Sequence, residues 1–154
     1  MSITIEIEIN RDFAIEGPFD KVFDLLADVP ASASYFPKLD KLTDLGDNSF
    51  RWEMEKVGID KYNIQTSYAC NYVSDKEAGT ISWTPVEGEG NSRVSGRWKI
   101  RKEGENLTQL RFQTEAELTL PFPRLMKMAI SPVIKHEFNG LVDQYVKNLQ
   151  NAFV

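Results

Sequence analysis

The sequence has very little of the side-chain chemistry on which most enzymes and metal sites depend. It contains one cysteine, Cys70, and one histidine, His136, in 154 residues. A single cysteine excludes a disulfide within the chain and a site with several thiolate ligands. A single histidine excludes multi-histidine metal sites, and no glycine-rich phosphate-binding loop precedes a helix. We therefore expect no metal and no cofactor.

Long apolar runs and an excess of positive charge are absent as well. No stretch approaches the ~20 apolar residues that cross a bilayer, and residues 1–6 lack the basic and apolar regions of a signal peptide. The chain has 18 Lys and Arg against 23 Asp and Glu, a net charge of −5, so phosphate backbones and anionic lipid surfaces should repel it as a whole. We expect a cytoplasmic protein with no nucleic-acid partner and no stable membrane insertion; the oligomeric state stays open.

What the chain does have is the composition of a single globular domain over residues 1–154. Its residues are 42% hydrophobic and 27% charged, which is ordinary for a soluble protein with a substantial core. No repeat, low-complexity tract or linker interrupts it. A disordered or fibrous protein is thereby excluded.

The first part of the chain predicts a long strand and two short helices. Residues 3–15 alternate between isoleucine-rich and polar positions, which is typical of a strand with one buried face. Pro18 then begins a short helix, and Pro30 ends it. Residues 31–36 predict a second short helix or a turn, because Pro37 disfavours helix at the residue before it.

From residue 39 to residue 120 the period is two, which predicts about six further strands. One long strand is expected over residues 62–72, where tyrosine occupies half of the alternate positions on one face. Turn-like sequences at 75–79 and 103–106 and a glycine-containing break at 85–91 separate the later strands. Successive hairpins of this kind predict a mostly antiparallel sheet.

Residues 122–154 predict one long amphipathic helix, which must cover the whole sheet. Its apolar positions recur every three or four residues: Phe122, Leu125, Met126, Ala129, Val133, Ile134, Phe138, Leu141, Val142, Tyr145, Leu149 and Phe153. Because a single helix often cannot fill the interior of a curved sheet, this pattern suggests a ligand cavity.

The order of these elements resembles the START-like superfamily, also called SRPBCC or Bet v 1-like. The residues that carry the resemblance are the isoleucine-rich strand 3–15, the helix PFDKVFDLL at 18–26, the strand SGRW at 95–98 and the proline-flanked LPFP at 120–123. They are most similar to the polyketide cyclase and coenzyme Q-binding-protein-like branch. The resemblance spans nearly the whole chain and rests on the order and spacing of these short motifs.

The resemblance implies an α+β helix-grip fold. In this fold a curved antiparallel sheet of about seven strands wraps a long C-terminal helix, with two short helices after the first strand and a hydrophobic cavity in between. Lipid and sterol carriers, hormone and quinone binders, aromatase/cyclases, oxygenase domains and chaperone activators share it, so the fold leaves the function open.

If the apolar faces point inward, aromatic side chains and a few hydroxyls line that cavity, as is usual for ligand pockets. The predicted ligand-binding residues are Trp52, Met54, Tyr62, Ile64, Tyr68, Tyr72, Trp83, Trp98, Phe112, Met126, Ile130, Val133 and Phe138, with Cys70, Thr114, Ala129 and Leu141 as further candidates. For any one of them, simple core packing is the competing interpretation. The family resemblance favours a cavity for the group.

Arg11 lies on the isoleucine face of the first strand. A buried guanidinium is costly unless a carboxylate or a ligand anion pairs with it. The competing interpretation, favoured by its polar neighbours, is a bulge or strand end that turns Arg11 into solvent.

Candidate catalytic residues are scarce. His136 is predicted on the solvent side of the terminal helix, which argues against a general base. The alternating carboxylates Glu53 and Glu55, and Glu115 and Glu117, fall on predicted outer faces. We predict no catalytic residue and favour a binding protein over an enzyme.

Pro132 interrupts the helical pattern and should kink or split the terminal helix. One interpretation is a gate formed by residues 121–131, whose apolar side chains beside Arg124 and Lys127 also suit transient contact with a membrane or a protein. The other is a plain kink that follows the curvature of the sheet.

The sequence thus predicts binding or transport of a hydrophobic small molecule, such as a lipid, isoprenoid, quinone or polyketide-like compound. The first alternative is an aromatase/cyclase-like enzyme in which Arg11 or the tyrosines guide a polyketide chain. The second alternative is a protein-interaction module of the chaperone-activator or ribosome-associated type.

Overall fold

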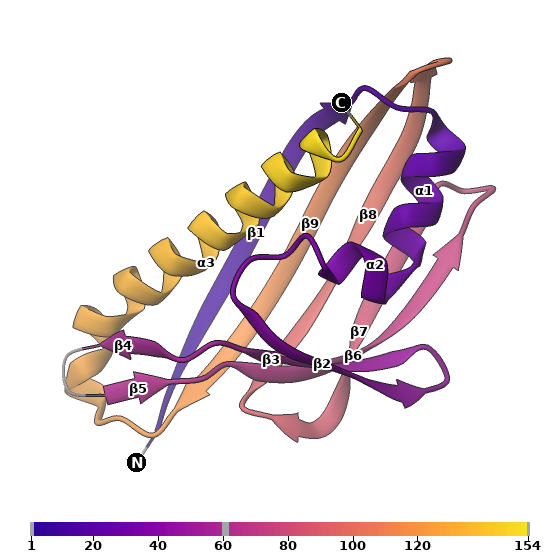
Figure 1. Ribbon diagram of the computed structural model, residues 1–154. Coiled ribbons are helices and arrows are strands. Elements are labelled where there is room, and N and C mark those ends of the chain that lie inside the picture. Colours follow the sequence, from indigo (N-terminus) through magenta and orange to yellow (C-terminus); the bar gives the residue numbers. More distant parts are fainter. Residues whose placement is uncertain (1, 60–61, 154) are drawn as a thin grey trace.

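The computed structural model describes residues 2–59 and 62–153. Strand β1 (Ile3–Ile15) leads into two short helices, α1 (Phe19–Ala27) and α2 (Val29–Ala33). The 3-10 turn η1 (Arg124–Met126) and the long helix α3 (Lys127–Asn151) follow the last strand (Figure 1). The strands between them are β2 (Leu39–Gly46), β3 (Ser49–Met54), β4 (Val57–Ile59), β5 (Tyr62–Ile64), β6 (Ser67–Asp75), β7 (Thr80–Gly90), β8 (Ser92–Gly104) and β9 (Leu107–Leu120).

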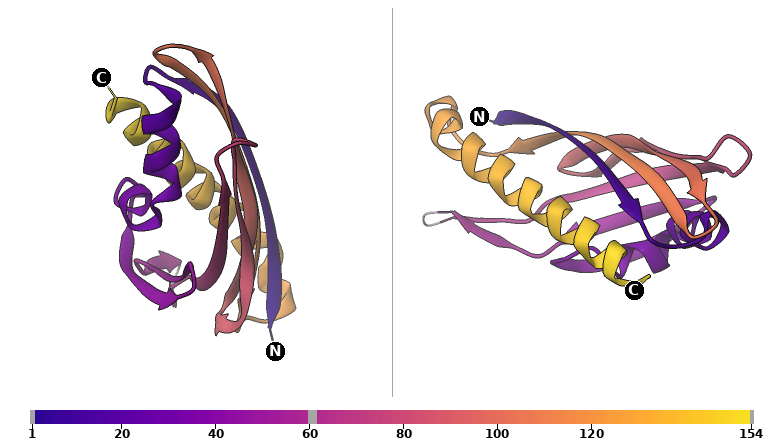
Figure 2. Two further views of the ribbon diagram at one scale, coloured as in Figure 1. Left: turned by 90° about the vertical axis from the view of Figure 1, so that its right-hand side faces the viewer. Right: turned by 90° about the horizontal axis from the view of Figure 1, so that it is seen from above.

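Seven of these strands form one antiparallel sheet in the order β1-β9-β8-β7-β6-β3-β2, and β4 pairs with β5 in a separate hairpin. The three helices lie on one side of the sheet, and the β2–β3 end of the sheet curves round to that same side (Figure 2). This arrangement confirms the predicted α+β helix-grip fold. The concave face of the sheet therefore looks toward all three helices.

Strand β1 shows why alternation predicted the sheet so well. Ile3, Ile5, Ile7 and Ile9 are buried, while the residues between them are exposed. The strand pairs with β9 without a register shift from Ile3, opposite Leu120, to Ile15, opposite Thr108. Since a strand places alternate side chains on opposite faces, an unbroken register keeps Arg11 on the helix side. The expected bulge or strand end at Arg11 is therefore wrong.

Residues 62–72 form two strands, where one was predicted. The break falls at Gln65 and Thr66, where the chain leaves the β4–β5 hairpin and joins the main sheet. Asn91 stabilises this crossing point, because its side chain donates to the carbonyl of Gln65 and accepts from the backbone N–H of Ser67. Alternation continues through the break, so the sequence pattern alone did not reveal it.

The predicted break at residues 85–91 lies largely inside β7. The strand continues to Gly90, and the pairing with β6 jumps from Cys70 opposite Pro85 to Tyr68 opposite Gly90. Gly88 and Gly90 have φ of +80° and +77°, conformations that favour glycine. The turn residues thus form a bulge within a strand instead of ending it.

The short helices begin and end close to where the prolines predicted. Pro18 precedes α1, which buries Val22, Phe23 and Leu26. Helix α2 includes Pro30 in its first turn, and the Asp28 carboxylate caps it by accepting from the N–H of Ala31. The second helix therefore begins earlier than the predicted residues 31–36.

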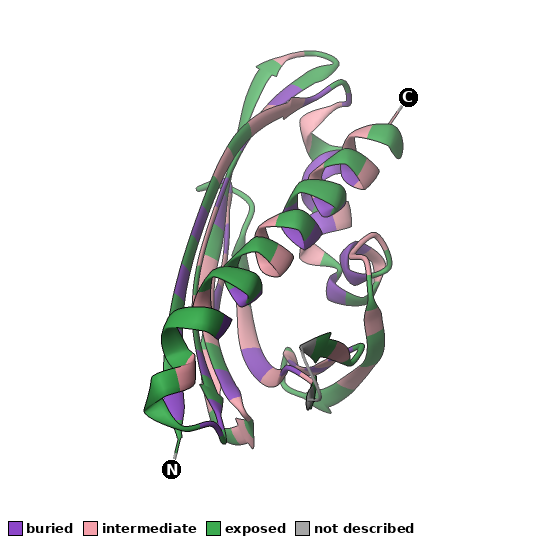
Figure 3. Cartoon of the chain, turned by 90° about the vertical axis from the view of Figure 1, so that its left-hand side faces the viewer, coloured by how far each residue is buried: buried purple, intermediate pink, exposed green. Residues whose placement is uncertain are grey.

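Helix α3 begins at Lys127 and is continuous through Pro132, so the predicted split is wrong. Residues 122–126 precede the helix, and Arg124–Met126 form the turn η1. Its buried side chains are Ile130, Ile134, Leu141, Val142, Tyr145 and Leu149. The opposite side of the helix is exposed along its length (Figure 3). Within the described residues, no helix is both long and apolar enough to span a bilayer.

Leu125, Ala129 and Val133 were predicted on the buried stripe, and all three are exposed. Successive residues of a helix lie about 100° apart around its axis, so Val133 and Ile134 cannot both face the sheet squarely. The sheet covers only a narrow face of the helix at this end. The predicted stripe was too wide there.

Candidate functional site

A cavity of about 110 Å³ lies between the concave face of the sheet and the helices. The sheet supplies most of its wall, and α1, α2, the segment after α2 and the middle of α3 close it. The lining residues are Ile7, Ile9, Leu26, Val29, Ser32, Phe36, Trp52, Met54, Thr66, Tyr68, Tyr72, Ile81, Trp83, Ser92, Val94, Trp98, Phe112, Thr114, Ala116, Leu118, Phe138, Val142 and Tyr145. No Asp, Glu, Lys, Arg or His occurs among them.

Most of the aromatic residues predicted to line a cavity do so. The predicted residues in the lining are Trp52, Met54, Tyr68, Tyr72, Trp83, Trp98, Phe112, Thr114 and Phe138. They come together because each occupies an inward position on its strand or on the buried face of α3. Whether they contact a ligand remains a prediction.

The other predicted residues lie elsewhere. Ile64, Cys70, Ile130 and Leu141 are buried in the core but are not among the residues that line the cavity, and Met126 is half-buried in the turn η1. Val133 is 46% exposed and Ala129 is also exposed, because the sheet covers only one line of α3 residues there. The side chain of Tyr62 lies outside the described residues. A role for Val133 in the cavity is therefore wrong.

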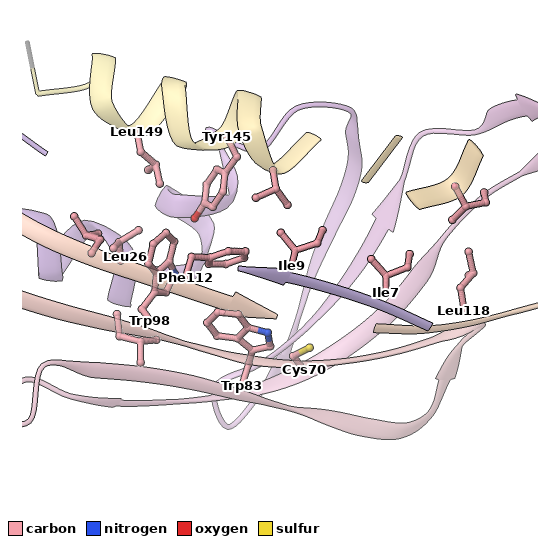
Figure 4. Packing of buried hydrophobic residues seen from close by; sticks show 14 of the residues in the cluster. Ile7, Ile9, Leu26, Cys70, Trp83, Trp98, Phe112, Leu118, Tyr145 and Leu149 are labelled. Atoms are coloured by element: carbon pink, nitrogen blue, oxygen red, sulfur yellow. The ribbon is translucent and has the colours of Figure 1, made fainter. Parts of the chain in front are cut away.

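The aromatic side chains form a continuous wall along the cavity. Trp98 and Phe112 have ring centroids 4.7 Å apart, and Trp83 lies 5.7 Å from Phe112. Tyr145 reaches down from α3 toward Trp98 and Phe112 (Figure 4), with ring centroids 6.2 and 6.4 Å from theirs. Such contacts add stabilisation beyond the burial of apolar area.

Gly96 makes room for this wall. A Cβ at this position would lie 2.6 Å from the ring of Trp83 and 2.3 Å from the carbonyl oxygen of Gln113. Real Cβ atoms do not approach other atoms so closely. The glycine of the SGRW motif is thus explained by the close packing of an indole ring on the sheet.

The sequence did not single out Ser32, which shares a buried hydrogen bond with the Tyr145 hydroxyl. Tyr145 lies on the predicted apolar stripe of the terminal helix, so the sequence pattern indicated its inward position. No sequence pattern indicated Ser32, because only the packing of α2 against α3 brings its hydroxyl to the cavity. The pair places one hydroxyl from each helix against the lining.

Three further hydroxyls belong to residues that line the cavity, those of Tyr72, Tyr68 and Thr66. The hydroxyl of Tyr72 accepts a hydrogen bond of 3.0 Å from Trp52 Nε1. Among the described residues, the hydroxyls of Tyr68 and Thr66 have no hydrogen-bond partner, although both residues line the cavity. Among the described residues, every fully buried side-chain N or O atom has a hydrogen-bond partner, so the hydroxyls of Tyr68 and Thr66 keep some accessible surface.

Burial raises the pKa values of the ionisable groups near the cavity. It raises the pKa of Tyr68 well above its usual value, and nearby Cys70 and Tyr145 raise it further. Burial also raises the pKa of Tyr145 to about 12, although the hydrogen bond with Ser32 opposes the shift. The Cys70 thiol has a pKa of about 12 for the same reason. At neutral pH the tyrosines are hydrogen-bond donors, and Cys70 is no thiolate nucleophile.

The remaining candidates for chemistry lie outside the cavity. His136 is exposed, as predicted. Glu53 and Glu117 face Arg51 and Arg93 at 3.6 and 3.7 Å on the outer surface. Arg11 pairs with a carboxylate of α3 and does not line the cavity. In the part of the chain that the structure describes, no group of three or more His, Cys, Asp or Glu could hold a metal ion.

An uncharged aromatic cavity between a curved antiparallel sheet and one long helix defines a protein of the START-like, helix-grip class. The sequence matches the family described as polyketide cyclase / dehydrase and lipid transport over residues 6–152. The chain belongs to this family, which confirms the resemblance seen in the sequence. Comparison with curated protein sequences gave no match.

Solved structures agree on the fold. A START superfamily protein from Mycobacterium smegmatis superposes with a TM-score of 0.67 at 15% identity, over 95% of this chain and 96% of that one. The Zhui aromatase/cyclase from Streptomyces sp. R1128 gives a TM-score of 0.61 at 18% identity, over 96% and 91%. A Thermus thermophilus protein gives 0.63 at 18% identity, over 96% and 99%. At such low identity these likenesses establish the fold alone.

Proposed function

We propose that the protein binds and carries a neutral hydrophobic small molecule in the cavity between the sheet and α3. The observation that carries this proposal is the lining itself, which is aromatic and aliphatic, has no charged side chain, and contains two hydroxyls without a partner among the described residues. Ligand pockets combine an apolar wall with a few polar groups in this way. The family's description, which includes lipid transport, supports the same class of function.

The lack of charge narrows the ligand. An ionised carboxylate buried here would have no cation beside it, which is costly. Tyr68 and Thr66 instead offer hydroxyl donors to a carbonyl, ester or ether oxygen. Quinones, isoprenoids with an oxygen function, esterified lipids and polyketide-like aromatics fit this chemistry, whereas a free fatty acid fits it poorly.

The size of the cavity adds a condition. A volume of about 110 Å³ is of the same order as a ~150 Å³ cavity that holds one benzene ring. A ligand larger than one ring or a short chain therefore requires α3, α2 or the β4–β5 hairpin to move outward. We expect ligand binding to change the packing of these elements more than that of the sheet.

A cyclase-like activity is the second candidate, supported by the family's description and by the likeness to an aromatase/cyclase. No lining residue is a general base at neutral pH, because the lining lacks His, Asp and Glu and its tyrosines are neutral. Such an enzyme would act by holding a reactive chain in shape and by donating hydrogen bonds from Tyr68 and Tyr72. Binding alone requires an apolar cavity and no control of a reacting chain, and we therefore favour binding over cyclase activity.

The test uses the cavity residues and a matched control. Purified protein is titrated with a neutral quinone and with a hydrocarbon of similar size, with quenching of the lining tryptophans as the signal and native mass spectrometry as a check. Ala116→Phe should fill the cavity and weaken both ligands at least tenfold. Tyr68→Phe should weaken only the quinone, by about two- to tenfold, because it removes one neutral hydrogen bond.

Ala152→Leu, which enlarges an exposed alanine after α3, should leave both affinities unchanged. If the wild-type protein binds neither ligand and carries no small molecule in native mass spectrometry, the binding proposal fails. Turnover of a polyketide-like substrate that Tyr68→Phe or Tyr72→Phe slows would favour the cyclase instead.

A further inference from the structure

The turn η1 and the first residues of α3 carry an unusual exposed surface. Leu125 is 93% exposed and Met128 is 88% exposed, the highest values among the large hydrophobic side chains of the described residues. They lie three positions apart, so they are neighbours on the surface. We call Leu125 and Met128, together with the exposed Arg124 and Lys127, the apolar-basic surface.

The segment that carries this surface has a charge opposite to that of the chain as a whole. Residues 121–136 contain Arg124, Lys127, Lys135 and His136 but no Asp or Glu, whereas the whole chain has a net charge of −5. In the part of the chain that the structure describes, neither Arg124 nor Lys127 takes part in an ion pair. Both cations are therefore available to an external anion beside two exposed apolar side chains.

We propose that the apolar-basic surface docks the protein on an anionic phospholipid bilayer. Leu125 and Met128 would enter the region between headgroups and acyl chains, and Arg124 and Lys127 would lie at the level of the phosphates. An anionic bilayer matches both halves of this surface. A second copy of the chain matches it less well, because a two-fold contact through this surface sets cations against cations.

The position of the surface relative to the cavity gives the docking a consequence. The cavity lining includes Leu118, two residues before the end of β9, and Met54 and Thr66, which flank the β4–β5 hairpin. That hairpin and the first turn of α3 lie at the same end of the molecule (Figure 1). Docking would therefore bring this end of the cavity toward the membrane, although the docking itself does not depend on an occupied cavity.

Because the rest of the surface is acidic overall, docking should be weak, orientation-dependent and sensitive to salt. The experiment is sedimentation of the full chain with vesicles of equal parts phosphatidylcholine and phosphatidylserine, compared with pure phosphatidylcholine vesicles. Leu125→Asp with Met128→Asp should abolish sedimentation. Arg124→Ala with Lys127→Ala should lower the partition coefficient on anionic vesicles by about tenfold or more, because each cation contributes about 1 kcal/mol near such a surface.

Two matched controls keep the result specific. Val73→Asp with Leu45→Asp places the same two charges at other exposed apolar residues, on β6 and β2, and Lys21→Ala with Lys102→Ala removes two exposed cations from α1 and β8. Both should bind vesicles as the wild type does. All the substituted side chains are exposed, so circular dichroism should show folded protein throughout.

Loss of binding in the two surface variants only, together with weak binding to neutral vesicles, would support the proposal. No binding by the wild type, or equal loss in the control with Val73→Asp and Leu45→Asp, would overturn it. Dimerisation in analytical ultracentrifugation that Leu125→Asp removes would also overturn it, and would assign the surface to a second copy. Binding of an acidic protein through this surface, without binding to vesicles, would overturn the proposal and assign the surface to that protein.

Discussion

At the scale of single residues, Arg11 shows how a polar side chain is held on an apolar face. Its Nε donates to Asp143 Oδ1 at 2.7 Å and its Nη2 donates to Asn139 Oδ1 at 2.8 Å. The Arg11 side chain is 28% exposed and that of Asp143 is 56% exposed. The guanidinium is thus only partly desolvated, and it ties β1 to α3 at the edge of the sheet.

We expect this ion pair to contribute modestly to stability. In a double-mutant cycle of Arg11→Ala and Asp143→Ala, the coupling free energy from urea unfolding should be about 0.5–1 kcal/mol, because solvent screens the exposed carboxylate. High salt should reduce it. The fully surface-located pair of Arg111 and Asp12, at 2.8 Å, should couple less. A coupling above that of a buried pair, or none at all, would contradict this interpretation.

At the scale of elements, α3 accommodates a proline in its second turn. Pro132 lacks the N–H that would bond to the carbonyl of Met128, and its ring crowds that carbonyl. The residue is exposed, so water can reach the freed carbonyl, and the helix remains continuous. This accommodation favours a plain structural role for Pro132, while the gate formed by residues 121–131 stays a prediction.

We predict that Pro132→Ala stabilises the protein by about 1–3 kcal/mol, since proline is the least favourable residue inside a helix. The measurement is the urea midpoint, with the association and dissociation rates of a bound dye as a second readout. Those rates should stay unchanged if Pro132 only shapes the helix. Slower rates in the variant would favour the gate.

Gly140→Ala provides the matched control for this comparison. Gly140 is an exposed residue of α3, and an added Cβ would meet nothing within 4 Å. Its replacement should raise stability by about 1 kcal/mol through helix propensity alone. If Gly140→Ala also slows the dye, the effect belongs to helix stiffness in general and not to Pro132.

At the scale of the whole molecule, the interior contains several ionisable groups whose pKa values burial raises. Burial raises the pKa of Cys70 from 9.0 to about 12 and that of Tyr145 from 10.0 to about 12. It raises the pKa values of Tyr68 and Tyr72 as well. All four groups lie in or beside the cavity wall, so deprotonation would place charge in an apolar interior.

The protein should therefore lose stability at alkaline pH. The folded state holds these protons more tightly than the unfolded chain, so their stabilisation is complete below the unfolded pKa values and is lost as pH rises toward 12. Tyr145 alone should account for about 2–3 kcal/mol over this range. Urea unfolding as a function of pH measures the effect.

Variants identify the groups responsible. Cys70→Ala should flatten the fall that begins near pH 9, and Tyr145→Phe should flatten the fall that begins near pH 10. Each variant has its own cost at neutral pH, so only the slope against pH is compared. An unfolding free energy that stays constant up to about pH 11, or equal slopes in all variants, would show that these groups are not protected by burial.

The sequence alone was sufficient for the fold class, the family and much of the cavity wall. Alternation in β1, β8 and β9 and the helical period of α3 depend on which face of a regular element is apolar, and this is a local property. This local pattern identified Trp52, Trp83, Trp98, Phe112 and the inward tyrosines. The pattern was less reliable at Leu125 and Val133, because the width of a buried helix face depends on how much of it the neighbouring sheet covers.

What only the tertiary structure decided depends on contacts between residues far apart in the chain. Three such contacts join segments that no local pattern relates. Arg11 pairs with Asp143, Ser32 bonds to Tyr145, and Asn91 bonds to Gln65 at the break between β5 and β6. Local periodicity tells which side of an element is apolar, but it cannot tell which partner covers it. The cavity and the uncovered apolar-basic surface both depend on which partner covers each apolar face.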